Sequence, residues 1–378
     1  ISTLKLKGSY GELGNNRAVN ADGSNNYFPY LQLYEVGYSE LTNIGVSLGR
    51  VVDKNLTWEK TASTNVGIEL GLFNDRFKMG ADVYQKKSID LIYSIPIAGS
   101  LGNTIYTTNT GSVKNYGLEM YFSSGNVRTA NFTWNTDLNF SLDRSEITSL
   151  SQESFINGSK RWEVGRSIYD FWMQEWAGVD PATGKGQWYV DGLDANGNRN
   201  VTTNYSAASR NYTGKSSLPD VVGGLTNYFK YKNFDMNILF NFSYGAYVYD
   251  SSYASLMTGL KEAGRSGSAD LENRWQQPGD ITDTPRLFQG TQDYASQSTR
   301  FLFKNNYIRL KALNIGYNFP KDVMNSIGVN NIRIYLQGDN LLTFQSHKGI
   351  DPEQNFAGTT DSRSYNQRLA SLGFSIDF

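Results

Sequence analysis

The residue types that carry most enzyme chemistry are scarce in this chain. Of its 378 residues none is Cys and one, His347, is His. Without Cys the chain offers no thiolate nucleophile, disulfide or Cys-ligated metal, and a single imidazole cannot supply a site that needs two. Ser and Asp are plentiful, so residue types alone leave open a triad with His347 as its base. We favour a loop position for His347 instead.

Two groups of residues with side-chain oxygens have spacings that catalysis or metal binding uses. Asp351 and Glu353 would face the same way in an extended segment, as paired catalytic carboxylates do. Pro352 between them favours a structural turn. The run DANGN at 194–198 begins like a calcium loop, but Tyr205 occupies the twelfth position, where a bidentate Glu is needed. We therefore predict a turn there, no metal site and no cofactor.

Aromatic residues gather in a long polar segment, where they could stack on sugar rings or clamp peptide side chains. The predicted substrate-binding residues are Trp162, Tyr169, Trp172, Trp176 and Trp188. Phe171 and Tyr189 lie beside them in the same segment. The same side chains could instead pack the loops together or form an interfacial girdle. Both roles stay open at this stage.

The overall composition is unusual for a water-soluble domain. Aromatic residues reach 14% and charged residues only 19%, against a usual charged share of about 25%. The net charge of -1 argues against a nucleic-acid partner. With 37 Gly and 8 Pro, the sequence is typical of many extended segments joined by turns.

Strict alternation of apolar and polar residues predicts the strands. In the segment 132–142, Phe132, Trp134, Leu138, Phe140 and Leu142 share one face and polar residues the other. The same pattern recurs at 64–73, 76–85, 118–122, 234–242, 332–336 and 372–378. Within 307–319 the parity slips, and a β-bulge near Lys311 or Ala312 would repair it.

The lengths of these segments and of their connections predict a membrane barrel. We count roughly ten to twelve strands, each about the 9–11 residues that cross a bilayer when tilted. Connections are short at 74–75, 124–128 and 231–233, and long at 15–59, 149–219 and 250–299. In lipid such a sheet must close, because every backbone polar group needs a partner. A soluble β-sandwich or propeller is the alternative.

Two further expectations follow from a barrel. Charged residues on the polar faces would line its lumen: Lys78, Asp82, Glu119 and Asp137. The final residue, Phe378, ends an amphipathic last strand and looks like the signal that barrel-insertion machinery reads.

Several motifs resemble one family. The segment 55–97 carries Trp-Glu, Thr-x-x-Asn-x-Gly, Gly-Leu-Phe, Tyr-x-Lys-Lys and Asp-Leu in order, and GSVKN is followed by Tyr116, Gly117 and Glu119. The stretches 308–320, 331–344 and 348–353 repeat a carboxy-terminal signature. Together they resemble the SusC-like TonB-dependent outer-membrane transporters of Bacteroidota, over most of the chain and least in the long loops.

This resemblance implies an all-β fold, a transmembrane antiparallel β-barrel of about twenty-two strands with long extracellular loops. Residues 1–378 would be a carboxy-terminal piece with roughly half of the barrel, without the plug domain and TonB box. The whole protein would lie in the outer membrane of a Gram-negative bacterium and import oligosaccharides or oligopeptides. It would not be an enzyme.

The partners implied by the resemblance are a SusD-like surface lipoprotein, the remaining amino-terminal barrel and plug, the TonB complex acting through that plug, and outer-membrane lipid. Two rival functions remain. One is a smaller intact barrel, either a passive porin or a barrel enzyme with a His-based site. The other is a soluble surface adhesin, which would have polar outer strand faces.

Overall fold

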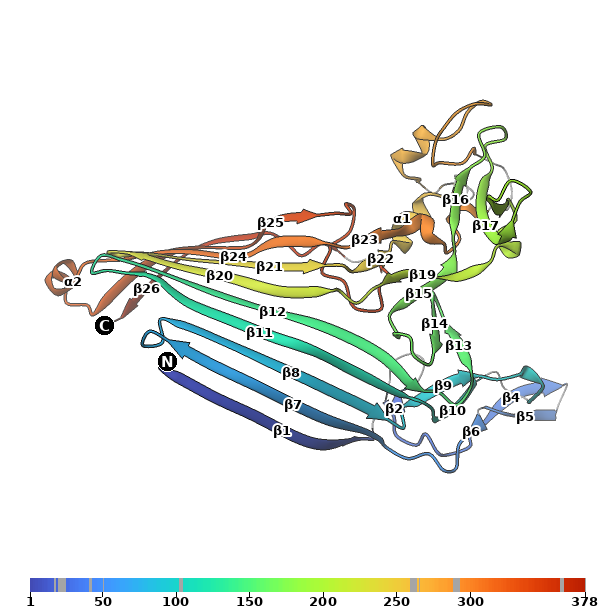
Figure 1. Ribbon diagram of the computed structural model, residues 1–378, viewed down its shortest axis with the longest axis horizontal. Helices are drawn as coiled ribbons and strands as arrows, with labels where there is room; N and C mark the ends of the chain where they lie inside the picture. Colours follow the sequence, from blue (N-terminus) through green and yellow to red (C-terminus); the bar gives the residue numbers. More distant parts are fainter. Residues whose placement is uncertain are drawn as a thin grey trace.

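A ten-stranded antiparallel sheet dominates the computed structural model, which describes residues 1–16, 18–19, 25–40, 43–49, 51–101, 105–258, 264, 266–287, 293–360 and 364–377. Each strand pairs with the next long strand along the chain, and β1 and β26 form the two edges (Figure 1). The strands are β1 (Thr3–Asn15), β7 (Glu59–Leu72), β8 (Phe77–Ile89), β11 (Ser112–Arg128), β12 (Phe132–Ser149), β20 (Val221–Tyr231), β21 (Phe234–Tyr244), β24 (Tyr307–Asn318), β25 (Asn331–Gln345) and β26 (Leu369–Asp377).

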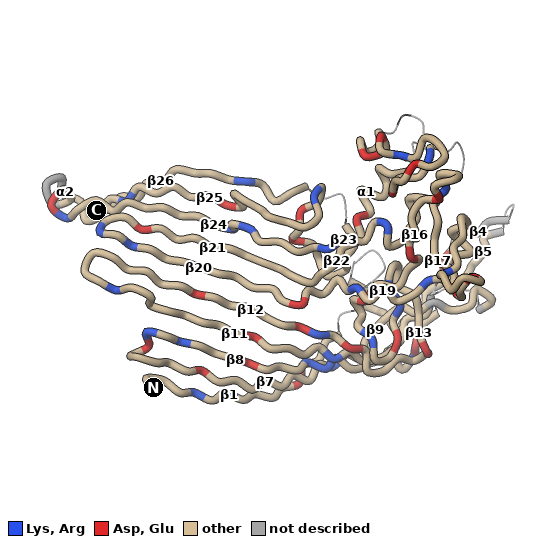
Figure 2. Tube along the Cα trace, turned by 45° about the horizontal axis from the view of Figure 1, so that its top comes forward, with Lys and Arg blue, Asp and Glu red and all other residues tan. Residues whose placement is uncertain are grey.

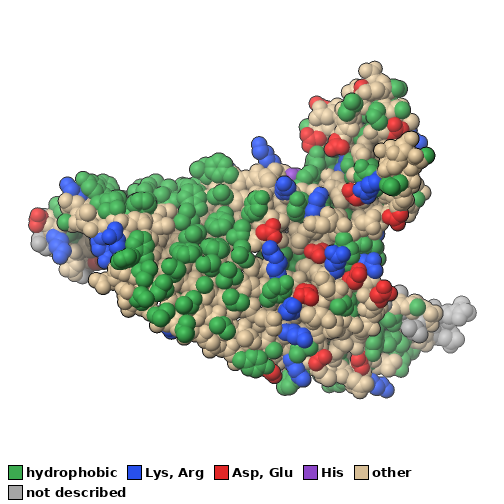
Figure 3. All heavy atoms as spheres, in the orientation of Figure 1, with side chains coloured by type: hydrophobic (Ala, Val, Ile, Leu, Met, Phe, Trp, Pro, Cys, Tyr) green, Lys and Arg blue, Asp and Glu red, His purple; other side chains and the backbone are tan. Residues whose placement is uncertain are grey.

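The sheet bends into a trough whose convex face is apolar. Ile68 is 42% exposed and Leu372 is 77% exposed, while inward glycines such as Gly67 are buried. Figure 3 shows hydrophobic side chains covering this face, and Figure 2 shows charged residues spaced singly along the strands and crowded at the end nearest the loops. The apolar rows do not face one another across a core, as they would in a soluble β-sandwich. The predicted all-β antiparallel fold is confirmed.

Aromatic side chains border the apolar face at its short-turn end. Trp134 stacks on Phe229 with ring centroids 5.7 Å apart, and Phe234 lies 4.6 Å from Tyr317. Tyr317 also contacts Phe319 at 5.1 Å. Rings at this level are typical of the aromatic girdle that flanks the apolar band of a membrane barrel.

The connections differ sharply between the two ends of the sheet. Turns at 73–76 and 232–233 are tight, as predicted, whereas β12 and β20 are joined through 150–220. The predicted turn at 124–128 is wrong. Those residues belong to β11, whose register shifts between Gly125 and Val127, and the turn lies at 129–131. A bulge lets the strand continue past a break in its alternation.

The predicted β-bulge in the segment 307–319 is confirmed. On β24 the register with β21 skips Lys311, so that Leu310 pairs with Phe240 and Ala312 with Leu239. The bulge keeps the apolar residues before and after it on the convex face.

The long connections fold into a loop layer at the other end of the sheet (Figure 1). Its short strands are β2 (Ala18–Val19), β3 (Asn25–Asn26), β4 (Tyr34–Glu40), β5 (Asn43–Leu48), β6 (Val51–Val52), β9 (Ile92–Pro96), β10 (Ile105–Asn109), β13 (Ser154–Asn157), β14 (Lys160–Glu163), β15 (Asp170–Gln174), β16 (Trp176–Val179), β17 (Gly186–Leu193), β18 (Arg199–Thr202), β19 (Arg210–Ser216), β22 (Tyr247–Tyr249) and β23 (Leu302–Lys304).

Helices are few and short. The loop layer holds α1 (Ser251–Leu256) and the 3-10 helices η1 (Gly99–Leu101), η2 (Tyr205–Ala207), η3 (Ala269–Asn273), η4 (Asp293–Ala295) and η5 (Thr299–Phe301), and α2 (Lys321–Ile327) follows β24. Of the helices that the structure describes, none has the length and apolarity needed to cross a membrane. Phe378, the predicted insertion signal, lies outside the described residues.

The apolar side chains lie on the convex face of the sheet, and a pair of substitutions can show whether this face contacts lipid or water. Ile68→Arg places a charge midway along the apolar rows of β7 and should lower the unfolding free energy in lipid or detergent by about 2–4 kcal/mol. Asn139→Arg, on the concave face, should cost less than about 1 kcal/mol. Denaturant titration of the two variants measures the difference. Equal, small losses would mean that the convex face meets water.

Candidate functional site

The concave face of the trough carries polar side chains that reach across strands over glycines. Lys7 on β1 places Nζ 2.9 Å from Oε1 of Glu69 and 3.1 Å from Oδ2 of Asp82. Gly67 lies between Lys7 and Asp82 in the register. A Cβ at Gly67 would lie 2.1 Å from Oδ1 of Asp82, so glycine is what gives the ion pair its room.

The same arrangement recurs farther along the sheet. Nη2 of Arg333 on β25 lies 2.8 Å from Oδ2 of Asp235 on β21, across Gly316 of β24. A Cβ at Gly316 would lie 2.2 Å from Nη2 of Arg333. Tyr84 likewise crosses Gly117 to donate to Asp143. We call these cross-strand contacts, Lys7 with Glu69 and Asp82, Arg333 with Asp235, and Tyr84 with Asp143, the polar rungs. Their side chains lie along the sheet and leave the middle of the trough open.

The side chains that line the open middle of the trough are acidic or can form hydrogen bonds. Glu119 lies directly opposite Asp82, and it has no ion-pair partner among the described residues. A hollow of about 650 Å³ includes in its lining Asp82, Glu119, Tyr121, Asn139, Ser141 and Asn241. Lys78 and Asp137 share this face, as the sequence predicted, because each alternates with outward apolar residues. Such a surface suits solutes rich in hydroxyl and amide groups.

The predicted binding residues Trp176 and Trp188 lie together in the loop layer. Their ring centroids are 5.3 Å apart, and Trp188 also contacts Tyr205 at 5.5 Å and Tyr294 at 6.3 Å. Arg300 lies over Trp176, 4.9 Å from its ring centroid. Trp188 is 1% exposed, so it forms part of a small loop core. This geometry favours the packing role for Trp188.

The other predicted residues lie in separate clusters. Trp162 contacts Tyr93 at 4.8 Å and Phe155 at 5.1 Å. Trp172 lies beneath the guanidinium groups of Arg161 and Arg210, at 5.5 and 5.1 Å. The structure therefore does not bring the five aromatic residues into one site, and their binding role stays a prediction.

Tyr169 lies next to a buried lysine. Its ring is 6.0 Å from that of Phe356, and its carbonyl oxygen accepts a hydrogen bond from Nζ of Lys160 at 2.5 Å. Lys160 also donates to Oγ of Ser217 at 3.0 Å and lies 3.3 Å from the ring centroid of Phe171. Burial disfavours the ammonium form and lowers the pKa of Lys160 to about 7.

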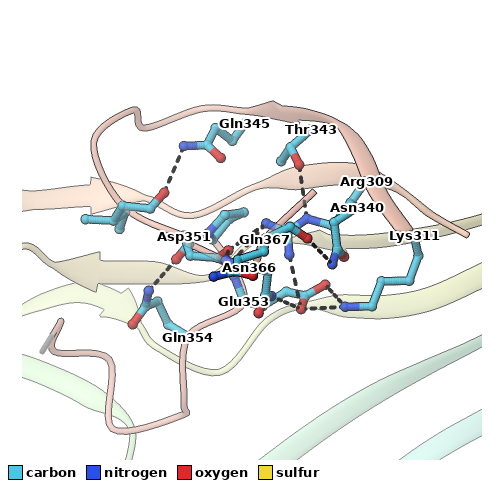
Figure 4. Close-up of polar contacts among 12 residues, drawn as sticks. Arg309, Lys311, Asn340, Thr343, Gln345, Asp351, Glu353, Gln354, Asn366 and Gln367 are labelled. Carbon is cyan, nitrogen blue, oxygen red and sulfur yellow. Dashed lines mark hydrogen bonds and ion pairs between the residues drawn. The ribbon is translucent and has the colours of Figure 1, made fainter. Parts of the chain in front are cut away.

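The paired carboxylates Asp351 and Glu353 meet two cations that the sequence analysis missed (Figure 4). Nη2 of Arg309 lies 3.1 and 3.0 Å from the two carboxylate oxygens of Asp351. Nζ of Lys311 lies 2.8 Å from Oε2 of Glu353. The side chain of Arg309 is 2% exposed. Both carboxylates are thus neutralised, which makes this a loop anchor and supports the structural turn over acid/base chemistry.

Further hydrogen bonds close the anchor around Asp351. Nε of Arg309 donates to Thr343 at 3.0 Å, and the backbone N–H of Asn366 donates to Oδ2 of Asp351 at 2.7 Å. The segments before and after residues 354–365 are therefore tied to the same strand pair. The signal that could have found the cations is spacing, since Arg309 and Lys311 are two apart, as are Asp351 and Glu353.

His347 forms a second tie between loops. Its Nε2 lies 2.8 Å from Oδ2 of Asp250, and its ring stacks on Phe303 with centroids 3.9 Å apart. Asp250 also accepts from the backbone N–H of Tyr253 and so caps α1. Burial raises the pKa of Asp250, but the hydrogen bonds from His347 and Tyr253 outweigh it, so the pKa lies below its ordinary value. Among the described residues no serine hydroxyl is hydrogen-bonded to His347.

The predicted turn at 194–198 is confirmed. Oδ1 of Asp194 accepts from the backbone N–H groups of Asn196 and Asn198, both at 2.8 Å, as in an Asx turn. Tyr205, the twelfth position, instead donates from its hydroxyl to the carbonyl of Gln297 at 2.9 Å. Within the described residues no group of three or more His, Asp or Glu could hold a metal ion.

Comparison with known proteins identifies relatives along nearly the whole chain. No family model matches the chain. A TonB-dependent receptor of Formosa agariphila, P3, is 30% identical over 392 residues, which cover 96% of this chain and 37% of that receptor. The SusC receptor of Bacteroides thetaiotaomicron is 27% identical over 403 residues, or 100% of this chain and 38% of the relative. The structure of the RagAB peptide transporter superposes with a TM-score of 0.87 at 28% identity, covering 99% of this chain and 41% of that one.

The chain is related along nearly its whole length to the SusC-like TonB-dependent receptors. It spans about two fifths of the length of the relatives named above. The members of this family align with the ten-stranded sheet and its loop layer together, since nearly the whole chain is covered in each comparison.

The buried ion pair of the loop anchor predicts a large effect from a single truncation. Asp351→Ala removes the bidentate partner of the buried Arg309 guanidinium and leaves it only Glu353, whose Oε2 lies 3.2 Å from Nη1. The loss should cost about 3 kcal/mol, whereas the double replacement Arg309→Met with Asp351→Leu should restore most of it. Hydrogen exchange at the Ser346 amide and proteolysis within 346–360 measure how readily this loop detaches from the sheet. Arg144→Gln, which breaks an exposed pair with Asp220, is the control and should cost less than about 1 kcal/mol. If Asp351→Ala destabilises the protein no more than Arg144→Gln does, Asp351 does not anchor the loop.

The buried lysine predicts a pH dependence of the loop layer. Because the folded pKa of Lys160 is about 7 and its ordinary value is 10.5, the unfolded state binds more protons between these values. Stability should therefore rise as the pH increases from about 7 toward 10, and it should be lowest below 7. Urea unfolding followed by tryptophan fluorescence measures this. Lys160→Met should flatten the rise and Lys54→Met, at an exposed loop position, should keep it; an unchanged rise in Lys160→Met refutes the assignment.

Proposed function

We propose that the chain forms part of the wall and the extracellular loop layer of an outer-membrane transporter that imports large polar nutrients, oligosaccharides or oligopeptides. The observation that carries this proposal is the inversion of the sheet, with apolar rows exposed outside and polar rungs inside. The ten strands are 9 to 18 residues long, mostly longer than the 9–11 expected from the sequence, because several continue from the membrane-spanning length into the loop layer. Strands long enough to cross a bilayer and the contrast between short turns and long loops support the proposal. The structural similarity to the RagAB peptide transporter supports the substrate class.

The proposed complex contains the partners that the family resemblance implies. Further strands close the trough into a barrel, a plug domain fills its lumen, and residues 1–378 are its carboxy-terminal portion. Energy comes from the TonB complex acting through the plug, and a SusD-like lipoprotein covers the loop layer. Closure is required physically, because the edges β1 and β26 would otherwise expose unpaired backbone groups to lipid.

The rival functions lack this support. A soluble adhesin needs polar outer strand faces, whereas the convex rows of this sheet are apolar and exposed. A barrel enzyme with a His-based site needs a nucleophile near His347, whose ring is instead held between Asp250 and Phe303. A passive porin would have the same kind of barrel wall. Only the dependence of uptake on energy distinguishes it from a TonB-dependent transporter.

The import function is tested in cells that depend on the intact protein for growth on an oligosaccharide or oligopeptide. Asn139→Trp and Asn241→Trp fill the hollow and should reduce uptake at least about tenfold, because the lumen then excludes bulky solutes. Ile315→Trp, on the convex face, is the matched control and should transport normally. Surface protease accessibility checks that all three variants assemble.

The energy requirement is tested in the same cells. Loss of the TonB complex should abolish uptake by the wild-type protein. Uptake that persists without this complex would identify a passive porin, and recovery of the protein in aqueous buffer without detergent would identify a soluble adhesin.

A further inference from the structure

Three lysines gather on the convex face, at the end nearest the loops. Lys114 on β11 lies directly opposite Lys87 on β8, and Lys60 on β7 is the diagonal neighbour of Lys87, opposite Ile89. All three alternate with outward apolar residues, and Lys60 and Lys87 are exposed. We call these residues the lysine cluster. Figure 3 shows basic side chains along this border of the apolar face.

The positive charge of the lysine cluster is only partly neutralised by neighbouring carboxylates. Nζ of Lys114 lies 2.7 Å from Oε2 of Glu146. Within the described ranges, neither Lys60 nor Lys87 has an ion-pair partner, whereas Lys7 on the concave face meets two carboxylates within 3.1 Å. Like charges directly opposite each other destabilise a sheet. An anion from outside the chain would remove this cost.

The position of the cluster matches the boundary of a membrane. Phe77 begins the convex row of β8 at the short-turn end, and the apolar positions continue through Met79, Ala81 and Val83 before Lys87. The span from Phe77 to Lys87 has the length of about 9–11 residues that carries a tilted strand across the hydrocarbon. Lys87 therefore lies where headgroups begin, on the side of the long loops.

A surface depression lies immediately beside the lysines. It measures about 600 Å³ and its lining includes Val66, Val83, Gln85, Lys114 and Tyr116. Val66 and Val83, which pair across β7 and β8, supply an apolar floor, and the ammonium group of Lys114 lies 4.9 Å from the ring centroid of Tyr116. The depression thus offers an apolar surface below and a cation above, which is the polarity of a lipid with an anionic headgroup.

We propose that the lysine cluster and this depression bind a phosphate-bearing lipid of the outer leaflet. The inference rests on the proposed membrane location. The phosphate lies between Lys87 and Lys114, and an acyl chain lies along Val66 and Val83. Lysine ammonium groups bind phosphate as point charges, and clusters of basic residues at a membrane boundary attract anionic headgroups. A lipid in this position would offset the repulsion between the opposed lysines.

The test measures lipid binding to the intact protein in detergent by native mass spectrometry. The probes are a diphosphorylated lipid A, the same lipid without phosphates, and inorganic phosphate. The double variant Lys87→Gln with Lys114→Gln should bind the diphosphorylated lipid about thirtyfold more weakly, since each lysine contributes a factor of about five. Lys321→Gln, an exposed lysine at the other end of the sheet, should bind it as the wild type does.

Four other outcomes would overturn the proposal. Undiminished binding by the double variant, or equal binding of the lipid without phosphates, would overturn the proposal. Competition by inorganic phosphate at concentrations similar to those of the lipid would assign the lysines to a free anion instead. Loss of a co-purifying protein from the double variant, with lipid binding intact, would assign them to that partner. Detergent dependence is measured in parallel, because wild-type protein that is soluble without detergent refutes the membrane location itself.

Discussion

Hydrogen bonds between neighbouring strands hold the sheet together, because the part of the chain that the structure describes places no apolar core behind either of its faces. The two clusters of buried apolar residues that stand out among the described residues lie in the loop layer, around Phe171 and around Trp188. The convex face is exposed and the concave face carries polar rungs. A sheet built in this way is stable where the solvent itself is apolar, since the ladder then pairs every backbone group and the exposed rows contact acyl chains.

The polar rungs and the loop anchors follow from the same constraint. Without a core to position them, concave side chains are fixed by partners on other strands, as Lys7 is by Glu69 and Asp82. The loops are fixed to the wall in a similar way, by Arg309 with Asp351 and by His347 with Asp250. Electrostatic ties of this kind leave the middle of the trough clear, as the proposed passage for large polar solutes requires.

Alternation in the sequence predicted most of the sheet because each strand repeats one simple pattern. It gave the strands around Val66, Val83 and Phe140, and the slip at Lys311 correctly indicated a bulge. It misplaced one turn, since Gly125 begins a bulge rather than a chain reversal. The family resemblance, carried by the motifs in 55–97 and 308–353, agreed with the comparisons.

The site was less predictable than the wall. Asp351 and Glu353 were visible as a pair, but their partners Arg309 and Lys311 lie 42 residues away in each case. The matching two-residue spacing of the cations and the carboxylates was a signal, but it does not by itself say that the two pairs meet. The loop tryptophans were chosen by residue type. Burial then separated Trp188, whose ring is enclosed, from side chains that retain some exposure, and burial depends on how distant loops pack.

The most direct measurement asks which face of the sheet meets lipid. Residues 1–378 contain no Cys, so single labels can be placed in this part of the protein once any Cys elsewhere in the intact protein has been replaced by Ser. Single cysteines introduced in turn from 77 to 87 along β8 can be spin-labelled in the intact protein in liposomes and probed with oxygen and a water-soluble nickel complex. A convex face in lipid predicts a period of two, with 79, 81 and 83 accessible to oxygen and 78, 80 and 82 accessible to nickel. Nickel access to 79, 81 and 83, or no alternation at all, would contradict it.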